Sequence, residues 1–185
     1  MLATTFYLQQ TSPDQLRPAR KPDIDVRVVR AEEISPEFNQ YLYAAVGSDW
    51  YWTKRRDWTW QQWYDFLTST NQQTWVAWVR GTPAGYGLLL PGDGEVEIKD
   101  FGLVPSFIGR GLGGHLLTEV LRRAWEVPGT QRVWLHTCTL DGPHAIKNYE
   151  ARGLSIYHQE ETVEQDGIVL EPWPGASRSR PPSPA

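Results

Sequence analysis

The sequence predicts an α/β fold in which strands and helices follow one another within a single domain. Three observations lead to this prediction. The chain has 185 residues, of which 40% are hydrophobic, enough for one core. Segments with strand-like and helix-like patterns alternate along it, and a glycine-rich segment joins a strand to an amphipathic helix. The predicted order is β-α-α-β-β-β-α-β-α-β, without an internal repeat.

The first half of the chain is predicted to form a strand over 26–29 and two helices. Ser35 is a suitable N-cap for a helix over 36–46, whose first residue is a proline. The second helix covers 60–67, and Thr59 opens it with the Thr-x-x-Gln pattern of a capping box. The two helices bracket a segment rich in tryptophan.

A hairpin and a central strand are predicted in the middle of the chain. Residues 74–80 and 84–90 have strand patterns and are joined by a Gly-Thr-Pro turn. The segment 95–104 alternates at first and then becomes apolar, as expected of a central strand covered on both faces. The glycine-rich segment 109–114 leads directly into a helix with apolar residues at helical spacing.

The last third of the domain is predicted to hold one more helix between two strands: strand 132–137, helix 143–152 and strand 154–159. Residues 1–24 carry several prolines among polar neighbours, and we expect them to form an extended segment outside the domain. Residues 166–185 are rich in Pro, Ser, Gly and Arg and are predicted to be a flexible tail. The domain itself is placed at 25–165.

Composition and charge exclude several classes of protein. The net charge is only −4 and no dense Lys/Arg tract occurs, so no nucleic-acid partner is expected. The chain has no run of about 18 apolar residues, the length that could span a bilayer, and its start lacks a secretory signal. We therefore expect a cytoplasmic protein without a membrane partner. The single cysteine, Cys138, cannot form an internal disulfide or a zinc site, so no metal is expected.

Residues 109–114 carry the clearest chemical signal. Four glycines in six positions let the backbone turn sharply and approach a ligand closely, and the free N–H groups of the following helix start point outward together. Such a cradle suits an anion, naturally a pyrophosphate, and Arg110 can add positive charge. An ordinary glycine-rich loop is the alternative interpretation.

Two other nucleotide-binding motifs fit less well. Gly109, Gly111 and Gly114 satisfy G-x-G-x-x-G, but the dinucleotide fingerprint requires its loop directly after the strand, and residues 105–108 intervene. The next strand also lacks the acidic residue that the fingerprint places at its end. No Lys followed by Ser or Thr closes the glycine run, so the P-loop signature fails as well.

The stretch from Leu103 to Gly113 resembles the acetyl-CoA signature of the GNAT acetyltransferases: Leu-Val-Pro, a short loop, Gly-x-Gly-x-Gly and an amphipathic helix. The resemblance extends over about residues 26–159. It implies a GNAT fold, that is, a mixed, mostly antiparallel sheet splayed at its central strand, with helices on both faces and CoA in the V-shaped gap. The family signature begins with Gln or Arg; Ile108 departs from this rule, while the backbone cradle is kept.

The resemblance implies acetyl-CoA as co-substrate and assigns it residues on the central strand, in the glycine-rich segment and on the last helix. These are Phe101, Leu103, Ile108, Gly109, Arg110, Gly111, Leu112, Gly113, Gly114 and Asn148.

Acetyl transfer requires a base for the amine, stabilisation of the developing charge and an acid for the departing thiolate. The run 145–154 resembles the family's second signature, which makes Tyr149 the general acid near the CoA sulfur. A phenol is protonated at pH 7 and can donate that proton. By the same resemblance Glu97 is the general base, acting through water. The alternatives are a Tyr packed at a helix end and a solvated strand face formed by Glu95, Glu97 and Lys99.

Aromatic residues concentrate between the two early helices, where GNAT enzymes generally place elements that bind the acceptor. We therefore expect Trp50, Trp52 and Trp58 to contact an amine by cation–π and apolar interactions, with His136 at the mouth of the same site. Core packing by these aromatics is an equal alternative. His136 and Cys138 share a strand face, which leaves a thiol hydrolase as a further alternative, although no third orienting group accompanies them.

The sequence thus predicts an N-acetyltransferase that moves an acetyl group from acetyl-CoA to a primary amine of a small molecule or peptide by direct attack in a ternary complex. The alternative from another class is a catalytically silent CoA-binding or ligand-sensing module. Ile108 favours this alternative, as does Gly142, which replaces an Asn that often holds the pantetheine in the family. A homodimer is the candidate assembly.

Overall fold

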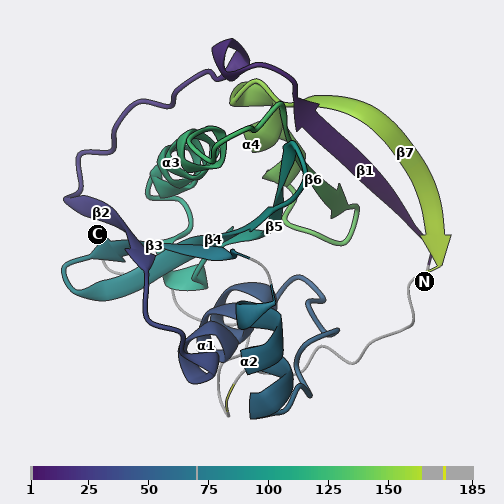
Figure 1. The fold of residues 1–185 in the computed structure, drawn as a ribbon. Coiled ribbons are helices and arrows are strands. Elements are labelled where there is room, and N and C mark those ends of the chain that lie inside the picture. Colours follow the sequence, from purple (N-terminus) through teal and green to yellow (C-terminus); the bar gives the residue numbers. More distant parts are fainter. Residues whose placement is uncertain (1, 70, 164–172, 174–185) are drawn as a thin grey trace.

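The computed structural model describes residues 2–69, 71–163 and 173; the tail predicted over 166–185 lies outside these residues apart from Trp173. Seven strands form one sheet, with α1 and α2 on one face and α3 and α4 on the other (Figure 1). The helices are α1 (Pro36–Gly47), α2 (Trp60–Thr68), α3 (Leu112–Trp125) and α4 (Ala145–Ala151). The strands are β1 (Leu2–Gln10), β2 (Val26–Ala31), β3 (Gln73–Val79), β4 (Thr82–Pro91), β5 (Glu95–Leu103), β6 (Arg132–Cys138) and β7 (Ser155–Val163). The predicted α/β fold is confirmed.

The sheet is mixed, and it splits at its centre. Its order is β2-β3-β4-β5-β6-β1-β7, and every neighbouring pair is antiparallel except β5 with β6. These two strands are parallel and form only three residue pairs, the last of them Glu97 with Trp134. Just beyond this point the register of β4 shifts between Leu88 and Leu89, opposite Lys99. Such a bulge bends a strand and increases its twist. The predicted splayed, mostly antiparallel sheet is therefore confirmed.

The helix ends follow the local signals in the sequence. The Ser35 side chain accepts a hydrogen bond from the Phe38 N–H at the start of α1. At the start of α2, Thr59 and Gln62 form the reciprocal bonds of a capping box, at 3.2 and 2.8 Å. Gly153, which follows Arg152 at the C-cap of α4, has φ +89°, which favours glycine. The caps predicted from sequence are present.

Residues 1–24, expected outside the domain, require a correction because β1 is an inner strand between β6 and β7. Its buried side chains include Leu8 and Gln10. The Gln10 amide accepts a hydrogen bond from the Trp125 indole N–H and donates one to the Arg152 carbonyl, each at 2.8 Å. A buried polar residue with both partners is stable in a core but does not produce the apolar alternation that marks a strand.

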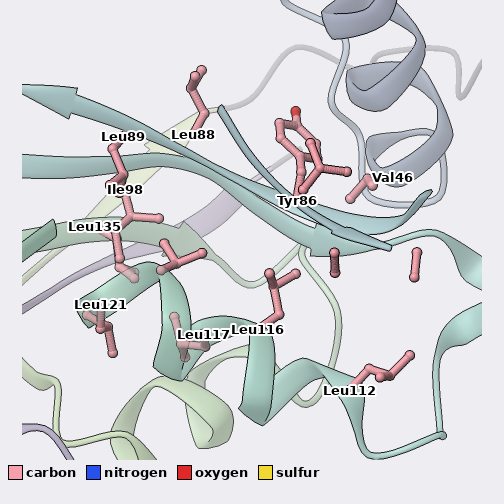
Figure 2. Packing of buried hydrophobic residues seen from close by; sticks show 14 of the residues in the cluster. Val46, Tyr86, Leu88, Leu89, Ile98, Leu112, Leu116, Leu117, Leu121 and Leu135 are labelled. Atoms are coloured by element: carbon pink, nitrogen blue, oxygen red, sulfur yellow. The ribbon is translucent and has the colours of Figure 1, made fainter. Parts of the chain in front are cut away.

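Helix α3 packs on one face of the sheet and contributes many residues to the core, and α1 covers the opposite face (Figure 2). The α3 side chains labelled in that view are leucines, all buried: Leu112, Leu116, Leu117 and Leu121. Val46 of α1 and Tyr86 of β4 lie on the other side of the sheet (Figure 2). Helix α3 approaches β4 very closely, since a Cβ on Gly87 would lie 2.6 Å from the Val120 side chain. Both faces of the central strands are thus covered.

A buried ion pair joins the segment between α1 and α2 to the central strand. Arg55 of this segment contacts Asp100 of β5, and the Tyr86 hydroxyl donates to the other carboxylate oxygen of Asp100 at 3.1 Å. Four aromatic rings surround the guanidinium, with centroids 4.5 to 5.7 Å from its carbon: Tyr43, Phe66, Trp58 and Trp63. Burial removes water from the Arg55 guanidinium, and the contacts with Asp100 and the four rings compensate for this loss.

Replacing Asp100 by Ala should lower the free energy of unfolding by about 3–5 kcal/mol, because Arg55 would keep a buried charge without its partner. The Arg55→Met/Asp100→Leu double variant should recover much of this loss. Asp93→Ala, in an exposed turn, is the matched control and should change stability by less than about 0.5 kcal/mol. Urea denaturation measures all four proteins, and equal effects of the two single substitutions would contradict the role of the ion pair.

Candidate active site

A cavity of about 870 Å³ opens where β5 and β6 separate. Its walls come from the ends of both strands, from residues 50–55 between the early helices, from the glycine-rich segment and from the start of α4. Strand β1 adds Thr5 and Tyr7. The split in the sheet therefore brings together the segments in which the sequence placed its candidate residues.

The glycine-rich segment ends in a helix start with unused backbone donors. Gly109 and Gly111 have φ angles of +83° and +74°, and a Cβ at either position would meet nothing within 4 Å. Gly111 is the N-cap residue of α3, and no side chain caps the helix there. The first N–H groups of a helix carry partial positive charge and bind anions well. Glycine is thus needed for the backbone conformation, and the space in front of it is open to a ligand.

Most residues assigned to acetyl-CoA surround this part of the cavity. The lining includes Phe101, Leu103, Ile108, Gly109, Gly111, Leu112, Gly113 and Asn148. The Asn148 amide lies beside the helix start, with Nδ2 3.8 Å from where a Cβ on Gly113 would stand. A phosphate group in front of α3 would have the backbone donors and this amide within one small region. The residues present therefore fit the pyrophosphate of an acyl-CoA.

Two assigned residues lie outside the cavity. Arg110 places its guanidinium over the Phe107 ring, 5.0 Å from the centroid, and does not line the cavity. Gly114 faces Arg152, whose Nη1 would be 2.5 Å from a Cβ on the glycine. Gly114 thus makes room for a neighbouring side chain, since α3 and α4 pack closely here, and Arg110 stacks on a ring.

Tyr149 of α4 forms part of the cavity wall. It is buried, lines the cavity and packs edge to face on Phe101 with ring centroids 6.0 Å apart. Burial, together with the nearby negative charge of Asp141, raises the pKa of the Tyr149 phenol well above its ordinary value. The phenol therefore stays protonated through the neutral and mildly alkaline range, as a proton donor requires.

Glu97 is near the cavity but does not line it. Its Oε1 lies 3.1 Å from Lys99 Nζ and 3.6 Å from His136 Nδ1, and both of these residues do line the cavity. Burial raises the pKa of Glu97, but its contacts with His136 and Lys99 outweigh burial and lower the pKa below the ordinary value. Glu97 is therefore held as a carboxylate behind two cationic or titratable side chains.

The aromatic segment divides between the cavity and the core. Trp50 and Trp52 line the cavity; Trp50 covers Gly142, with an indole carbon 3.6 Å from where a Cβ would stand. Trp58, expected to bind the acceptor, does not line the cavity. Its ring packs on Trp63 at 5.2 Å and belongs to the group around Arg55. This position requires a correction, because the Trp58 ring packs beside Trp63 and the Arg55 guanidinium and not on the cavity wall.

Cys138 lines the cavity beside Asp141. One oxygen of this carboxylate accepts hydrogen bonds from Thr137 Oγ1 at 2.5 Å and from the Cys138 N–H at 3.1 Å. Asp141 thus fixes the loop after β6 through the backbone of Cys138. The His136 imidazole contacts the Glu97 carboxylate on the preceding strand, so the geometry gives the thiol hydrolase no support.

Sequence reasoning missed several lining residues. Tyr7 belongs to β1, which was expected outside the domain, and its hydroxyl donates to Glu160 at 2.6 Å. Lys54 and Arg55, in the segment between α1 and α2, line the cavity close in sequence to Trp50 and Trp52. The Lys99 contact with Glu97 was visible only as charge alternation along one strand. The position of Tyr7 depends on the pairing of distant strands, which no local pattern reveals.

Residues 32–154 match the model of the acetyltransferase (GNAT) family. The chain therefore belongs to the GNAT family of acetyltransferases, and its family supports the acyltransferase class of enzyme. A search among curated proteins found no match.

Solved structures share this fold. A GCN5-related N-acetyltransferase from Sphaerobacter thermophilus has a TM-score of 0.66 at 17% identity, over 85% of this chain and 50% of its own. Another from Kribbella flavida has a TM-score of 0.61 at 21% identity, over 84% and 55%. The aminoglycoside acetyltransferase meta-AAC0020 from an uncultured soil metagenomic sample, in complex with trehalose, has a TM-score of 0.59 at 15% identity, over 77% and 95%. The chain spans about half the length of the first two, and identities this low show the fold alone.

Two features do not occur within the described ranges 2–69, 71–163 and 173. None of the helices there is both long and apolar enough to cross a bilayer. In the same part of the chain, no three His, Cys, Asp or Glu side chains come together in a group able to hold a metal ion.

Proposed function

We propose that the protein is an N-acetyltransferase that transfers an acetyl group from acetyl-CoA to a primary amine of a small molecule or peptide, by direct attack in a ternary complex. The observation that carries this proposal is the cavity between β5 and β6, which ends at the uncapped start of α3. The amine would approach from the opposite side, where residues 50–55 and the end of β6 form the wall.

The chain can hold acetyl-CoA, which supplies a thioester-activated acetyl group, in two ways. The glycine cradle and Asn148 would bind the pyrophosphate by backbone donors and one amide. Beyond Glu97, the β5 backbone has no partner in β6, so groups at Phe101 and Leu103 are available to the peptide-like pantetheine arm. The lack of a Gln or Arg at Ile108 costs one side-chain contact and leaves the backbone donors in place.

Tyr149 is the proposed proton donor to the departing thiolate. The raised pKa of its phenol keeps Tyr149 protonated, and its contact with Phe101, which would lie along the pantetheine arm, supports this role. CoA leaves more easily as a thiol than as a thiolate, so an acid positioned at the sulfur lowers the barrier to breaking the carbon–sulfur bond. The aminoglycoside acetyltransferase among the structural neighbours has amine-bearing acceptors by its name, which agrees with an amine acceptor here.

The alternative is a catalytically silent CoA-binding or ligand-sensing module. It is favoured by Gly142, where Trp50 covers the position from which an Asn side chain would reach the pantetheine. Release of CoA in the presence of amines separates the two functions, because a binding module gives no turnover.

The first test is the electrostatics of the cradle, using two substitutions of equal size. Gly111→Asp should weaken acetyl-CoA binding by at least about tenfold relative to Gly111→Asn, since a carboxylate repels the pyrophosphate. Asn is the matched control because Asn and Asp both tolerate the left-handed backbone at φ +74°. Calorimetric titration gives both affinities. Equal affinities in two folded variants would place the pyrophosphate elsewhere.

The second test concerns the acid. Tyr149→Phe should lower kcat by about 100-fold or more while acetyl-CoA affinity stays within about twofold of wild type, because only a proton is removed. Steady-state kinetics and calorimetry on the same preparation check this. An unchanged kcat would mean that another group protonates the thiolate or that the chemical step does not limit turnover.

A further inference from the structure

His136 lies between Glu97 and the cavity. It sits on β6, two residues beyond the last pair with β5, and lines the cavity, whereas Glu97 does not. The Nδ1 atom of His136 is 3.6 Å from Glu97 Oε1. The imidazole is 39% exposed and the carboxylate only 14%. A substrate in the cavity would therefore meet the imidazole first.

The Glu97 carboxylate is better suited to orient the His136 imidazole than to accept a proton from an amine. Lys99 Nζ lies 3.1 Å from the same Oε1 atom, and the pKa of Glu97 is lowered by its contacts despite burial. A lowered pKa makes a carboxylate a weaker base. Because Nδ1 faces a carboxylate, it is the nitrogen that carries hydrogen, which leaves Nε2 as the acceptor.

We infer that His136 is the general base of the reaction and that Glu97 is a positioning residue acting through it; this inference rests on the proposed acetyl transfer. As the bond between the amine nitrogen and the acetyl carbon forms and the carbon–sulfur bond breaks, the amine proton passes to His136 Nε2. The Tyr149 phenol gives its proton to the sulfur. The imidazolium then releases its proton to water and the phenolate regains one, so both residues return to their starting state.

Other titratable groups at the cavity fit this role less well. Among the described residues, the imidazole contacts Glu97 of β5 and the Tyr7 ring of β1, whose centroid lies 5.9 Å away, and Lys99 of β5 contacts the same Glu97 carboxylate. Lys99 is engaged as a cation by Glu97. The hydrogen bond to Glu160, with burial and that negative charge, raises the pKa of Tyr7, so its phenol remains protonated. His144 also lines the cavity but is exposed at the N-cap of α4.

The kinetic experiment compares four variants with wild type. Turnover of acetyl-CoA is first measured with spermidine, kanamycin A and the peptide Ala-Ala-Ala, and the fastest probe is used throughout. His136→Gln should lower kcat by at least about 100-fold, and Glu97→Gln by less. The double variant should be no slower than His136→Gln alone, because Glu97 acts only through the imidazole. Glu95→Gln is the matched control: Glu95 bonds Arg132 and Trp134, lies outside the cavity and should leave kcat unchanged.

The pH profile gives a readout that a structural role would not move. In Glu97→Gln, the acidic limb of kcat/KM should shift to lower pH, because loss of the carboxylate disfavours the imidazolium. In His136→Gln this limb should disappear. The same probe serves for all variants, so the titration of the amine is common to every profile.

A spectroscopic measurement separates this inference from the proposed function. Long-range proton–nitrogen NMR of the acceptor-free protein should show neutral His136 with hydrogen on Nδ1, and Glu97→Gln should change this signature. The opposite tautomer, or a Glu97→Gln loss of kcat larger than that of His136→Gln, would overturn the inference while acetyl transfer stands. Absence of wild-type turnover on every probe would contradict the proposed function and, with it, the catalytic role of His136.

Discussion

The early separation of β5 from β6 is the constraint on which the site depends. The two parallel strands pair only as far as Glu97 and Trp134, and a bulge at Lys99 bends β5 just beyond that point. The end of β5 is then fixed against α1, because a Cβ on Gly102 would lie 2.5 Å from the Val46 side chain. If β5 and β6 were paired over their full length, the backbone N–H and C=O groups at the end of β5 would bond to β6. Because the strands separate, this part of β5 lines the cavity instead.

The buried Arg55–Asp100 ion pair explains why so many aromatic residues surround one short segment. A charge removed from water needs both a counterion and a polarisable environment, and the rings of Tyr43 and Phe66 lie closest to the guanidinium, at 4.5 and 5.0 Å. Trp58 completes this group and stabilises the fold. The tryptophans nearer α1 remain at the cavity. One stretch of sequence thus contributes to core packing and to the cavity wall, and Asp100 connects it to the central strand.

Local chemistry made much of the fold predictable. Helix caps, the hairpin and the glycine-rich helix start depend on neighbouring residues, and they were expected from sequence. Strand β1 was not, because its buried side chains include Thr and Gln. The contact of Arg55 with Asp100 spans 45 positions, so no local pattern could show that Trp58 packs around a buried charge. In the same way, only the pairing of β5 with β6 places His136 in front of Glu97. Long-range pairing, more than residue type, determined what the sequence could not show.

Hydrogen exchange of the backbone amides, with and without acetyl-CoA, tests most directly whether the split sheet is a CoA site. Acetyl-CoA should slow exchange at residues 109–114, where the donors of the α3 start would bind phosphate, and at 101–103, where the β5 backbone has no partner in β6. The hairpin of β3 and β4 should exchange at the same rate in both states at its exposed turn. Unchanged exchange in both segments under saturating acetyl-CoA, or protection confined to the β1–β7 side of the sheet, would contradict this assignment.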